Sequence, residues 1–155
     1  MFKVNARLKD TKEVARLIKS GADVNARIDD GYTALMYVAG RNATDVAMLI
    51  EAGADVNARD NDGWTALMYA AHHKTTDMTR LLIESGADVN AKSKHGTTAL
   101  MYAAANNAAD VARLLIKSGA DINAKSNHGM TALMLAEEWA AADVIALLKA
   151  AGAKE

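Results

Sequence analysis

Residues 53–85 read GADVNARDNDGWTALMYAAHHKTTDMTRLLIES, and this stretch decides the fold because most of it returns along the chain. Its opening phrase, GADVNA or GADINA, begins at four glycines that are 32, 33 and 33 residues apart: Gly21, Gly53, Gly86 and Gly119. A second phrase, GxTALM, keeps the same phase and begins at Gly31, Gly63, Gly96 and Gly129. Two phrases in phase at such a period predict a stack of repeated units, each burying its apolar side against its neighbours. Function is then expected on a surface that crosses several units.

Each unit is predicted to contain two helices. Thr65 precedes the run ALMYAA, so its hydroxyl can cap a first helix that ends near His73. The second helix begins at Thr76, and its apolar stripe consists of Met78, Leu81, Leu82 and Ile83. Gly86 then ends this helix, because glycine adopts the left-handed conformation of a helix C-terminus at little cost.

The segment between two units is predicted to form a projecting hairpin. The Asp and Asn of each GADVNA phrase satisfy nearby backbone donors through side-chain turns, which gives a structural role to Asp23, Asp55, Asp88 and Asp121. Gly96 supplies the next tight turn before Thr98 caps the next helix. Small residues let neighbouring helices approach to roughly 8–10 Å. We expect this spacer role for Ala70, Ala71, Ala103 and Ala104.

The composition is typical of one helical domain. The chain has 155 residues, of which 51% are apolar, 24% charged and 5% aromatic. Its net charge of −1 gives no electrostatic attraction to nucleic acid or to an anionic membrane. The absence of cysteine excludes disulfides and thiolate chemistry. No stretch reaches the ~18 apolar residues of a membrane span, and we expect a cytoplasmic protein or a recombinant soluble one.

The repeated unit resembles the ankyrin repeat over nearly the whole chain, with its GxTALMYAA first helix, its DV or DM second helix and its GADVNA exit. The resemblance implies an all-α fold, an ankyrin-repeat solenoid of stacked helix-turn-helix units with projecting β-hairpin loops. One departure concerns the family's TPLH pattern, whose Pro and His are replaced here by Ala and Met at Ala34-Met36, Ala66-Met68, Ala99-Met101 and Ala132-Met134. We therefore expect methionine packing in place of the polar clamps that this His provides in the family.

A single domain over residues 1–155 is expected, divided by the repeat phase. Residues 1–24 are interpreted as a degenerate N-terminal capping unit, residues 25–56, 57–89 and 90–122 as repeats, and residues 123–155 as a C-terminal capping repeat. Repeat 25–56 is one residue short, and we expect the loss in the turn between Arg41 and Asp45, outside the packed helix. Phe2 to Leu8 are expected to cover one end of the stack. Glu137, Glu138 and Lys149 would give the other end a polar outer face.

No motif indicates catalysis or a cofactor. His72 and His73 are adjacent, so we expect their rings to point apart at a helix end, and the sequence supplies no further metal ligands there. His95 and His128 are equivalent positions one repeat apart, at about 10 Å, which is too far for one ion. Tyr37, Tyr69 and Tyr102 form a ladder that we interpret as partial core in preference to a ligand-stacking platform. Serine-protease, phosphate-loop and HExxH patterns are all absent.

Partner-binding positions are expected where the copies differ. The resemblance places them at the hairpin tips, at the residue after each GxT glycine and at the ends of the first helices. The tip residues are Asp29, Asp30, Asn61, Asp62, Lys94, His95 and His128. The residues after the glycines are Tyr32, Trp64, Thr97 and Met130. The helix-end residues are Arg41, His72, His73, Asn106, Glu138 and Trp139. Drift of unselected surface positions is the alternative explanation of this variation.

Two functions follow from these patterns. The first is a non-catalytic protein-protein interaction module, a monomer that binds a folded partner along its concave face, with Trp64 and Tyr32 as aromatic anchors and Trp139 outlying. The second is an engineered or consensus-derived scaffold with no native partner, favoured by the absence of Cys and Pro. Self-association through the N-terminal unit is a third possibility. The rim of tips is also expected to be electrically polar, since Asp29, Asp30 and Asp62 lie toward one end and His95 and His128 toward the other.

Overall fold

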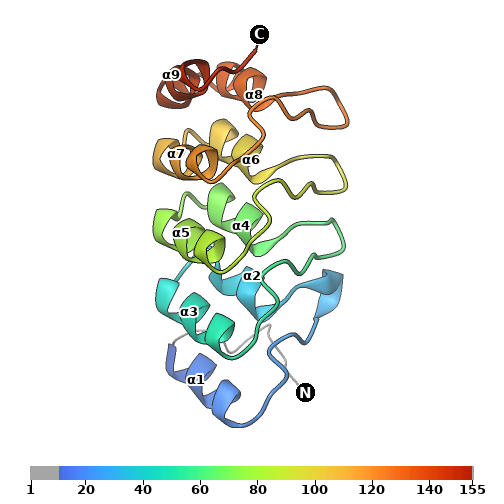
Figure 1. Cartoon of the computed structure of the whole chain (residues 1–155). Helices are drawn as coiled ribbons and strands as arrows, with labels where there is room; N and C mark the ends of the chain where they lie inside the picture. The colour runs from blue at the N-terminus through green and yellow to red at the C-terminus, as the bar shows by residue number, and fades with distance from the viewer. Residues whose placement is uncertain (1–10, 155) are drawn as a thin grey trace.

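A computed structural model describes residues 11–154, and all of its regular structure is helical over that range (Figure 1). The chain begins with α1 (Thr11–Lys19) and a short 3-10 helix, η1 (Asp29–Gly31). Four helix pairs follow: α2 (Ala34–Val38) with α3 (Ala43–Glu51), α4 (Ala66–His72) with α5 (Thr76–Glu84), α6 (Ala99–Ala105) with α7 (Ala109–Lys117), and α8 (Ala132–Glu138) with α9 (Ala142–Ala150). The expected role of Phe2 to Leu8 as a cover falls outside the described residues.

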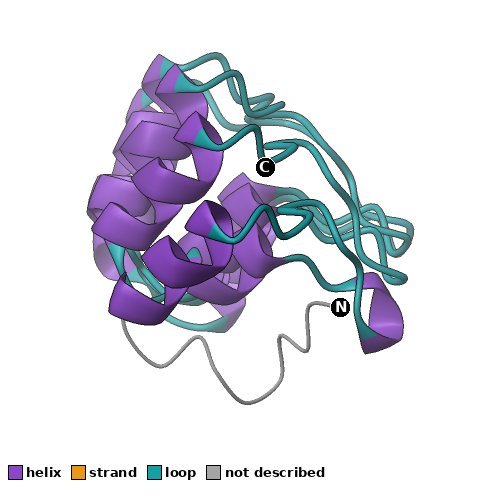
Figure 2. Ribbon diagram, turned by 90° about the horizontal axis from the view of Figure 1, so that it is seen from below, coloured by secondary structure: helices purple, strands orange, loops and turns teal. Residues whose placement is uncertain are grey.

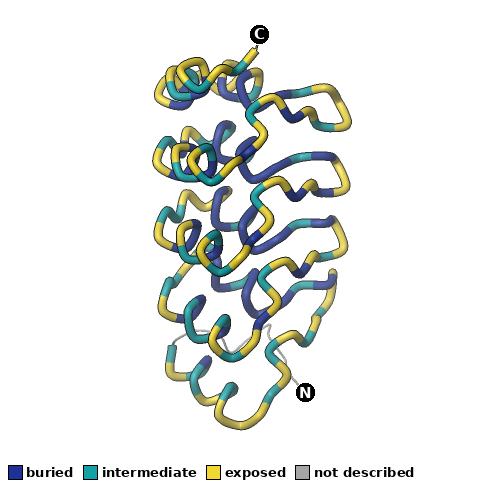
Figure 3. Tube along the Cα trace, in the orientation of Figure 1, coloured by how far each residue is buried: buried dark blue, intermediate teal, exposed yellow. Residues whose placement is uncertain are grey.

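The helices form two rows along the stack. The inner row consists of α2, α4, α6 and α8, and the outer row consists of α1, α3, α5, α7 and α9, with each helix contacting the next one in its row. Seen along the stack, the helices lie to one side and the loops that join the units project from them one above another (Figure 2). Buried segments recur at the same place in every unit (Figure 3). The stacked-repeat prediction is therefore confirmed.

The inner helices form as the sequence predicts. In each one the hydroxyl of the capping threonine accepts a hydrogen bond from the backbone N–H three residues later, as from Met68 to Thr65 at 3.4 Å. The spacer alanines are fully buried, and so is the leucine of every TALM phrase. Met36, Met68 and Met101 are only 1–2% exposed, which confirms that methionine packs between the units. Met134 is 39% exposed, because the described chain places no further inner helix against it.

A polar ladder of asparagines also joins the units, so a purely apolar description of the stack is incomplete. The amide of Asn57 donates to the carbonyl of Gly86 at 3.0 Å and accepts from the backbone N–H of Asp88 at 2.7 Å. Asn25 and Asn90 make the same pair of bonds to the unit that follows them. The carboxylate of each Asp in the GADVNA phrase accepts a hydrogen bond from the backbone N–H of the Asn two residues later, as predicted. The Asp therefore orders its own turn, whereas the Asn links one turn to the next.

The loops carry no β-strand between residues 11 and 154, so the expected β-hairpins are wrong in that respect. Each tip closes with few backbone bonds, such as those from Asp60 N–H to the Trp64 carbonyl and from Gly63 N–H to the Asp60 carbonyl, both 3.0 Å. Neighbouring tips share one backbone–backbone bond, for example from Asn61 N–H to the Asp30 carbonyl at 2.7 Å. A strand needs a longer ladder than this. Gly63 permits the close approach, since its φ is +78° and a Cβ there would lie 3.0 Å from the Lys94 nitrogen.

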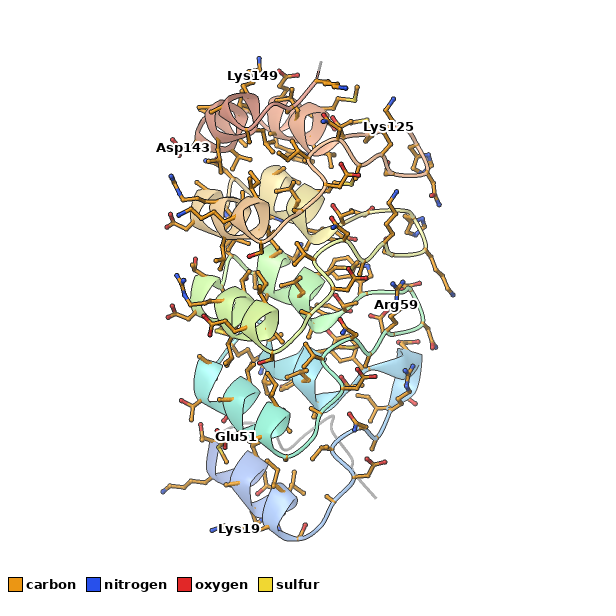
Figure 4. All side chains as sticks on the ribbon, in the orientation of Figure 1. Lys19, Glu51, Arg59, Lys125, Asp143 and Lys149 are labelled. Carbon is orange, nitrogen blue, oxygen red and sulfur yellow. The ribbon has the colours of Figure 1, made fainter. Side chains whose placement is uncertain are left out.

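Basic side chains reinforce the contact between loops. Arg27 donates to the carbonyl of Arg59 at 2.8 Å, and Arg59 donates to the carbonyl of Lys92 at 2.7 Å. Lys92 in turn donates to the carbonyl of Lys125 at 3.1 Å. Arg59 and Lys125 can be seen on the loop side of the stack in Figure 4. These cations therefore bind backbone of the next loop.

The short repeat lacks the left-handed residue that follows the inner helix in the other units. The other inner helices are followed by Lys74, Asn107 and Ala140, each with a positive φ. In each case the backbone N–H of the next residue donates to the carbonyl five positions back, as from Thr75 to Ala70. In the short repeat Asn42 bonds only four positions back, to Val38. The outer helix α3 keeps nine residues, as predicted, but α2 is shortened to five, so the loss also affects the inner helix.

The last unit presents mixed side chains at its end. Glu137, Glu138 and Lys149 are exposed as expected, and Lys149 pairs with Glu137 at 3.3 Å. Lys149 and Asp143 lie on α9 at the top of Figure 4. Trp139 is 65% exposed, so this end is polar only in part.

Candidate functional site

The predicted partner-binding residues fall on the loops and at the ends of the inner helices. Twelve of them are exposed: Asp29, Asp30, Arg41, Asn61, Asp62, His72, His73, Lys94, His95, His128, Glu138 and Trp139. Five are half-buried: Tyr32, Trp64, Thr97, Asn106 and Met130. The half-buried set includes both residues proposed as aromatic anchors, which have contacts within the chain that hold them in place.

Five rings form a continuous aromatic cluster, which we define as Tyr32, Trp64, Tyr69, His72 and Tyr102. The ring of Trp64 lies between those of Tyr69 and Tyr102, with centroids 4.9 and 4.2 Å away. Tyr32 meets Tyr69 edge-on at 5.0 Å, and His72 meets Trp64 at 5.8 Å. Three successive units contribute to this cluster. Such ring pairs add about 0.5–1.5 kcal/mol each beyond the area they bury, so the cluster is a rigid feature of the surface.

Asp60 holds the centre of the aromatic cluster. Its Oδ1 accepts hydrogen bonds from the backbone N–H groups of Asp62 and Trp64 at 2.9 and 2.8 Å. Its Oδ2 accepts from the hydroxyl of Tyr69 at 2.6 Å. Ser93 and Ser126 occupy the same place in the next two units, where their hydroxyls accept from the N–H groups of Thr97 and Met130 at 3.2 Å. Among these equivalent positions, only Asp60 adds a carboxylate charge.

The tyrosines of the aromatic cluster resist ionisation. Desolvation by burial is the main cause that raises the pKa of Tyr69, and the hydrogen bond to Asp60 raises it further. Desolvation also raises the pKa values of Tyr32 and Tyr102, with the charge of Asp60 adding to both. Desolvation, followed by the proximity of His73, lowers the pKa of His72, so this imidazole is neutral at pH 7. The aromatic cluster itself thus carries no charge, and carboxylates lie beside it.

The rings of His72 and His73 are in contact, so the expectation that they point apart is wrong. Their centroids are 5.3 Å apart in an edge-to-face arrangement. His72 is the last residue of α4, whereas His73 follows as its C-cap with φ −84° and ψ 2°, a conformation outside the helix. The His73 ring then lies over Gly40 of the preceding unit, where an added Cβ would meet its Cδ2. Together the two histidines link three units, because the amide of Asn106 lies 3.5 Å from His72 Nδ1.

Arg41 makes a different contact at the equivalent place in the short repeat. Its guanidinium carbon lies 4.2 Å from the ring centroid of Tyr37, and its Nη1 donates to the Tyr37 hydroxyl at 2.8 Å. Tyr37, Tyr69 and Tyr102 are all half-buried against the core, as the partial-core interpretation predicts. Tyr69 and Tyr102 also belong to the aromatic cluster, so the two interpretations of the tyrosine ladder are compatible.

The remaining predicted residues lie apart from the aromatic contacts. Lys94 and His95 take part in the bonds between tips through their backbone, and Asn127 donates to the carbonyl of Lys94 at 2.8 Å. Trp139 has no ring contact with another described residue, and it is the C-cap of α8 in the last unit. The structure therefore brings together Tyr32, Trp64, His72 and His73, and leaves Trp139 separate.

Sequence reasoning missed Asp60, Tyr69 and Tyr102 as members of this surface. The sequence did contain a signal for the tyrosines. Tyr69 lies five residues after Trp64, and Tyr102 lies five residues after Thr97, the equivalent of Trp64 in the next unit. Asp60 had no such signal. It resembles any loop carboxylate in the sequence, and only the fold places it beside Tyr69.

Within residues 11–154, no group of three or more His, Asp or Glu side chains is arranged to hold a metal ion. None of the helices described in that range is long and apolar enough to cross a membrane.

Comparisons with known proteins agree with the fold. A family model described as ankyrin repeats in three copies matches residues 3–93, which is more than half of the chain. A second, described as ankyrin repeats in many copies, matches residues 82–136. A search of curated proteins found no match. Ankyrin repeats generally serve in protein-protein interaction and are typically non-catalytic. With two helices per unit, a 33-residue period and these two matches, the chain belongs to the ankyrin repeat family.

Proposed function

We propose that this chain is a non-catalytic module that binds a folded protein partner through the aromatic cluster and the loop tips beside it. The observation that supports this most is the position of Trp64, half-buried between Tyr69 and Tyr102 and thus exposed in part on a rigid support. Aromatic residues held in this way provide most of the binding energy of protein interfaces. Little entropy is lost when a partner covers them, because the rings are already fixed.

The residues around the aromatic cluster complete a surface of the expected kind. Asn61, Asp62, Lys94 and His95 are exposed at the adjacent tips, and they form a polar rim around a less polar centre. Thr97, Asn106, His128, Met130 and Glu138 extend the surface toward the C-terminal end. Asp29, Asp30 and Arg41 extend it in the other direction. A partner that spans three units would cover most of these positions. One copy of this chain, as a monomer, is then enough to bind it.

A capture experiment tests the proposal. The wild-type chain, Trp64→Ala and Trp139→Ala are immobilised, and each is exposed to proteins of the source cell. We expect a partner retained by the wild type and by Trp139→Ala and lost by Trp64→Ala, with a loss of about 2 kcal/mol or roughly 30-fold in affinity for the purified partner. Both variants are first compared by circular dichroism and thermal melting.

The matched variant makes the result specific. Both substitutions remove one tryptophan, but Trp139 lies outside the aromatic cluster. Equal retention by Trp64→Ala and the wild type would overturn the proposed surface. If neither the wild type nor either variant retains a partner, the scaffold alternative without a native partner is favoured instead.

A further inference from the structure

Two carboxylates, those of Asp60 and Asp62, lie beside the aromatic cluster, and two more stand on the neighbouring loop tip. Asp60 lies in hydrogen-bond contact with Tyr69, and the charges of Asp60 and Asp62 both act on Tyr102. Asp30 belongs to the neighbouring tip, where its carbonyl accepts from Asn61. Asp29 precedes it in the same 3-10 helix. Of these four aspartates, Asp29, Asp30 and Asp62 are exposed, and their side chains have no hydrogen bond or ion pair among those found for the described residues.

Several described cations of the same loops already have contacts within the chain, although a hydrogen bond to a neutral carbonyl leaves their charge in place. Arg27, Arg59 and Lys92 bind backbone carbonyls of neighbouring loops. Arg41 is placed on the ring of Tyr37. His72 is neutral at pH 7 because burial lowers its pKa. Lys94 is a further cation at the next tip, and Lys125 lies in the loop after it. The loops around Trp64 thus carry cations as well as aspartates, and the exposed carboxylate of Asp62, whose charge acts on Tyr102, has no hydrogen bond or ion pair among those found for the described residues.

A contact within the chain gives an example of a group that packs on this row of tyrosines. In the short repeat Arg41 follows Tyr37 by four residues, stacks on its ring and donates to its hydroxyl. The residues four positions after Tyr69 and Tyr102 are His73 and Asn106. Neither carries a guanidinium. Units 57–89 and 90–122 thus keep the tyrosine but lack the arginine that the short repeat places on it, while unit 57–89 gains Trp64 and the carboxylate of Asp60.

We propose, on the basis of the proposed function, that the protein partner presents an arginine side chain to the aromatic cluster. The guanidinium stacks on the exposed part of Trp64 or Tyr102, and its N–H groups donate to the carboxylate of Asp62. Arginine suits this place better than lysine, because its planar group stacks on aromatic rings and donates to a carboxylate at the same time. Charge complementarity with Asp60 and Asp62 distinguishes this partner from an acidic or a purely apolar one.

Peptide titration tests this inference apart from the partner itself. The Trp139→Phe variant leaves Trp64 as the one tryptophan, so its fluorescence reports on the aromatic cluster. Hexa-arginine, hexa-lysine and hexa-glutamate peptides are added at low ionic strength. We expect a saturable change with hexa-arginine, an affinity for hexa-lysine that is lower by about threefold or more, and no binding of hexa-glutamate.

A charge-matched pair of variants makes the test specific. Asp30→Asn with Asp62→Asn removes the charge of Asp62 beside the aromatic cluster and that of Asp30 on the neighbouring tip, whereas Asp77→Asn with Asp110→Asn removes two exposed charges from the outer helices α5 and α7. We expect the first pair to weaken hexa-arginine binding about fivefold or more and the second to change it less than twofold. Absence of hexa-arginine binding, equal affinity for hexa-lysine, or equal effects of the two pairs would overturn the inference. Each of these outcomes leaves the capture result with Trp64→Ala unaffected, so the two proposals fail separately.

Discussion

The hydroxyl of Tyr69 donates a 2.6 Å hydrogen bond to Oδ2 of Asp60, which joins the inner helix α4 to the loop that precedes it. The same carboxylate orders the backbone of Trp64 through its other oxygen. One side chain thus fixes both the ring at the centre of the aromatic cluster and the loop beside it. Pre-organisation of this kind is what a binding surface requires, because flexible aromatic side chains lose entropy when a partner immobilises them.

Replacement of Asp60 should separate these two roles. Asp60→Ala removes three accepted hydrogen bonds and should lower the free energy of unfolding by about 2 kcal/mol. Asp60→Ser copies Ser93 and Ser126, which bond the backbone of their own loops, so it should recover part of that loss. Tyr69→Phe should remove about 1 kcal/mol. Urea denaturation of the three variants measures these values, and equal stability of Asp60→Ala and Asp60→Ser would show that the loop bond contributes nothing.

The asparagine ladder should stabilise the interior of the stack more than its end. Asn57→Ala removes two hydrogen bonds to the next unit, and we expect a loss of about 2 kcal/mol. Asn123 occupies the equivalent place in the last unit, where the described residues provide one such bond, from the Lys154 N–H at 2.9 Å. Asn123→Ala should therefore have about half the effect on the urea midpoint. The reverse order would contradict the ladder as an interaction between units.

Gly40 and His73 should be energetically coupled. A Cβ at Gly40 would meet the His73 ring, so Gly40→Ala must displace that ring. In a His73→Ala background the clash is absent, and the substitution should stabilise the chain by about 0.5–1 kcal/mol, because alanine restricts the unfolded chain more than glycine does. In the wild-type background we expect no gain. A double-mutant cycle by urea denaturation measures the coupling, and additive effects would place His73 elsewhere.

His72 should make the fold less stable in mild acid. Its pKa in the folded chain is lowered by desolvation and by His73, so the unfolded chain binds more protons below about pH 6.5. Stability should therefore decrease as the pH falls through this value, until the pH is below the folded-state pKa. His72→Asn should remove this part of the pH dependence. Urea midpoints at pH 7.5 and 5.5 test it, and the same difference between the two pH values in both proteins would assign the effect to other groups.

The regular part of the molecule could be predicted from the sequence because every unit repeats the same local signals. Thr65 and Gly86 mark where helices begin and end, and their equivalents do so in each copy. The packing of Met68 followed from its position in the repeat. The loops were less predictable, because too few backbone bonds form there to complete a strand.

The contacts between units were the part that sequence reasoning could not supply. The bond between Asp60 and Tyr69, the contact of the Trp64 and Tyr102 rings and the contact of His73 with Gly40 all depend on where the loops and the neighbouring units lie in the folded chain. His73 illustrates the reason: a C-cap residue has left the helical conformation, so helical spacing no longer says where its ring points.

Amide hydrogen exchange of the chain with and without its captured partner tests the central claim most directly. If the aromatic cluster is the binding surface, the partner should slow exchange in residues 60–73 and 93–106, which contain Trp64, Tyr69, His72 and Tyr102 together with their loops. The outer helices α5, α7 and α9 should exchange as they do in the free chain. Protection confined to those outer helices, with residues 60–73 unchanged, would contradict the account.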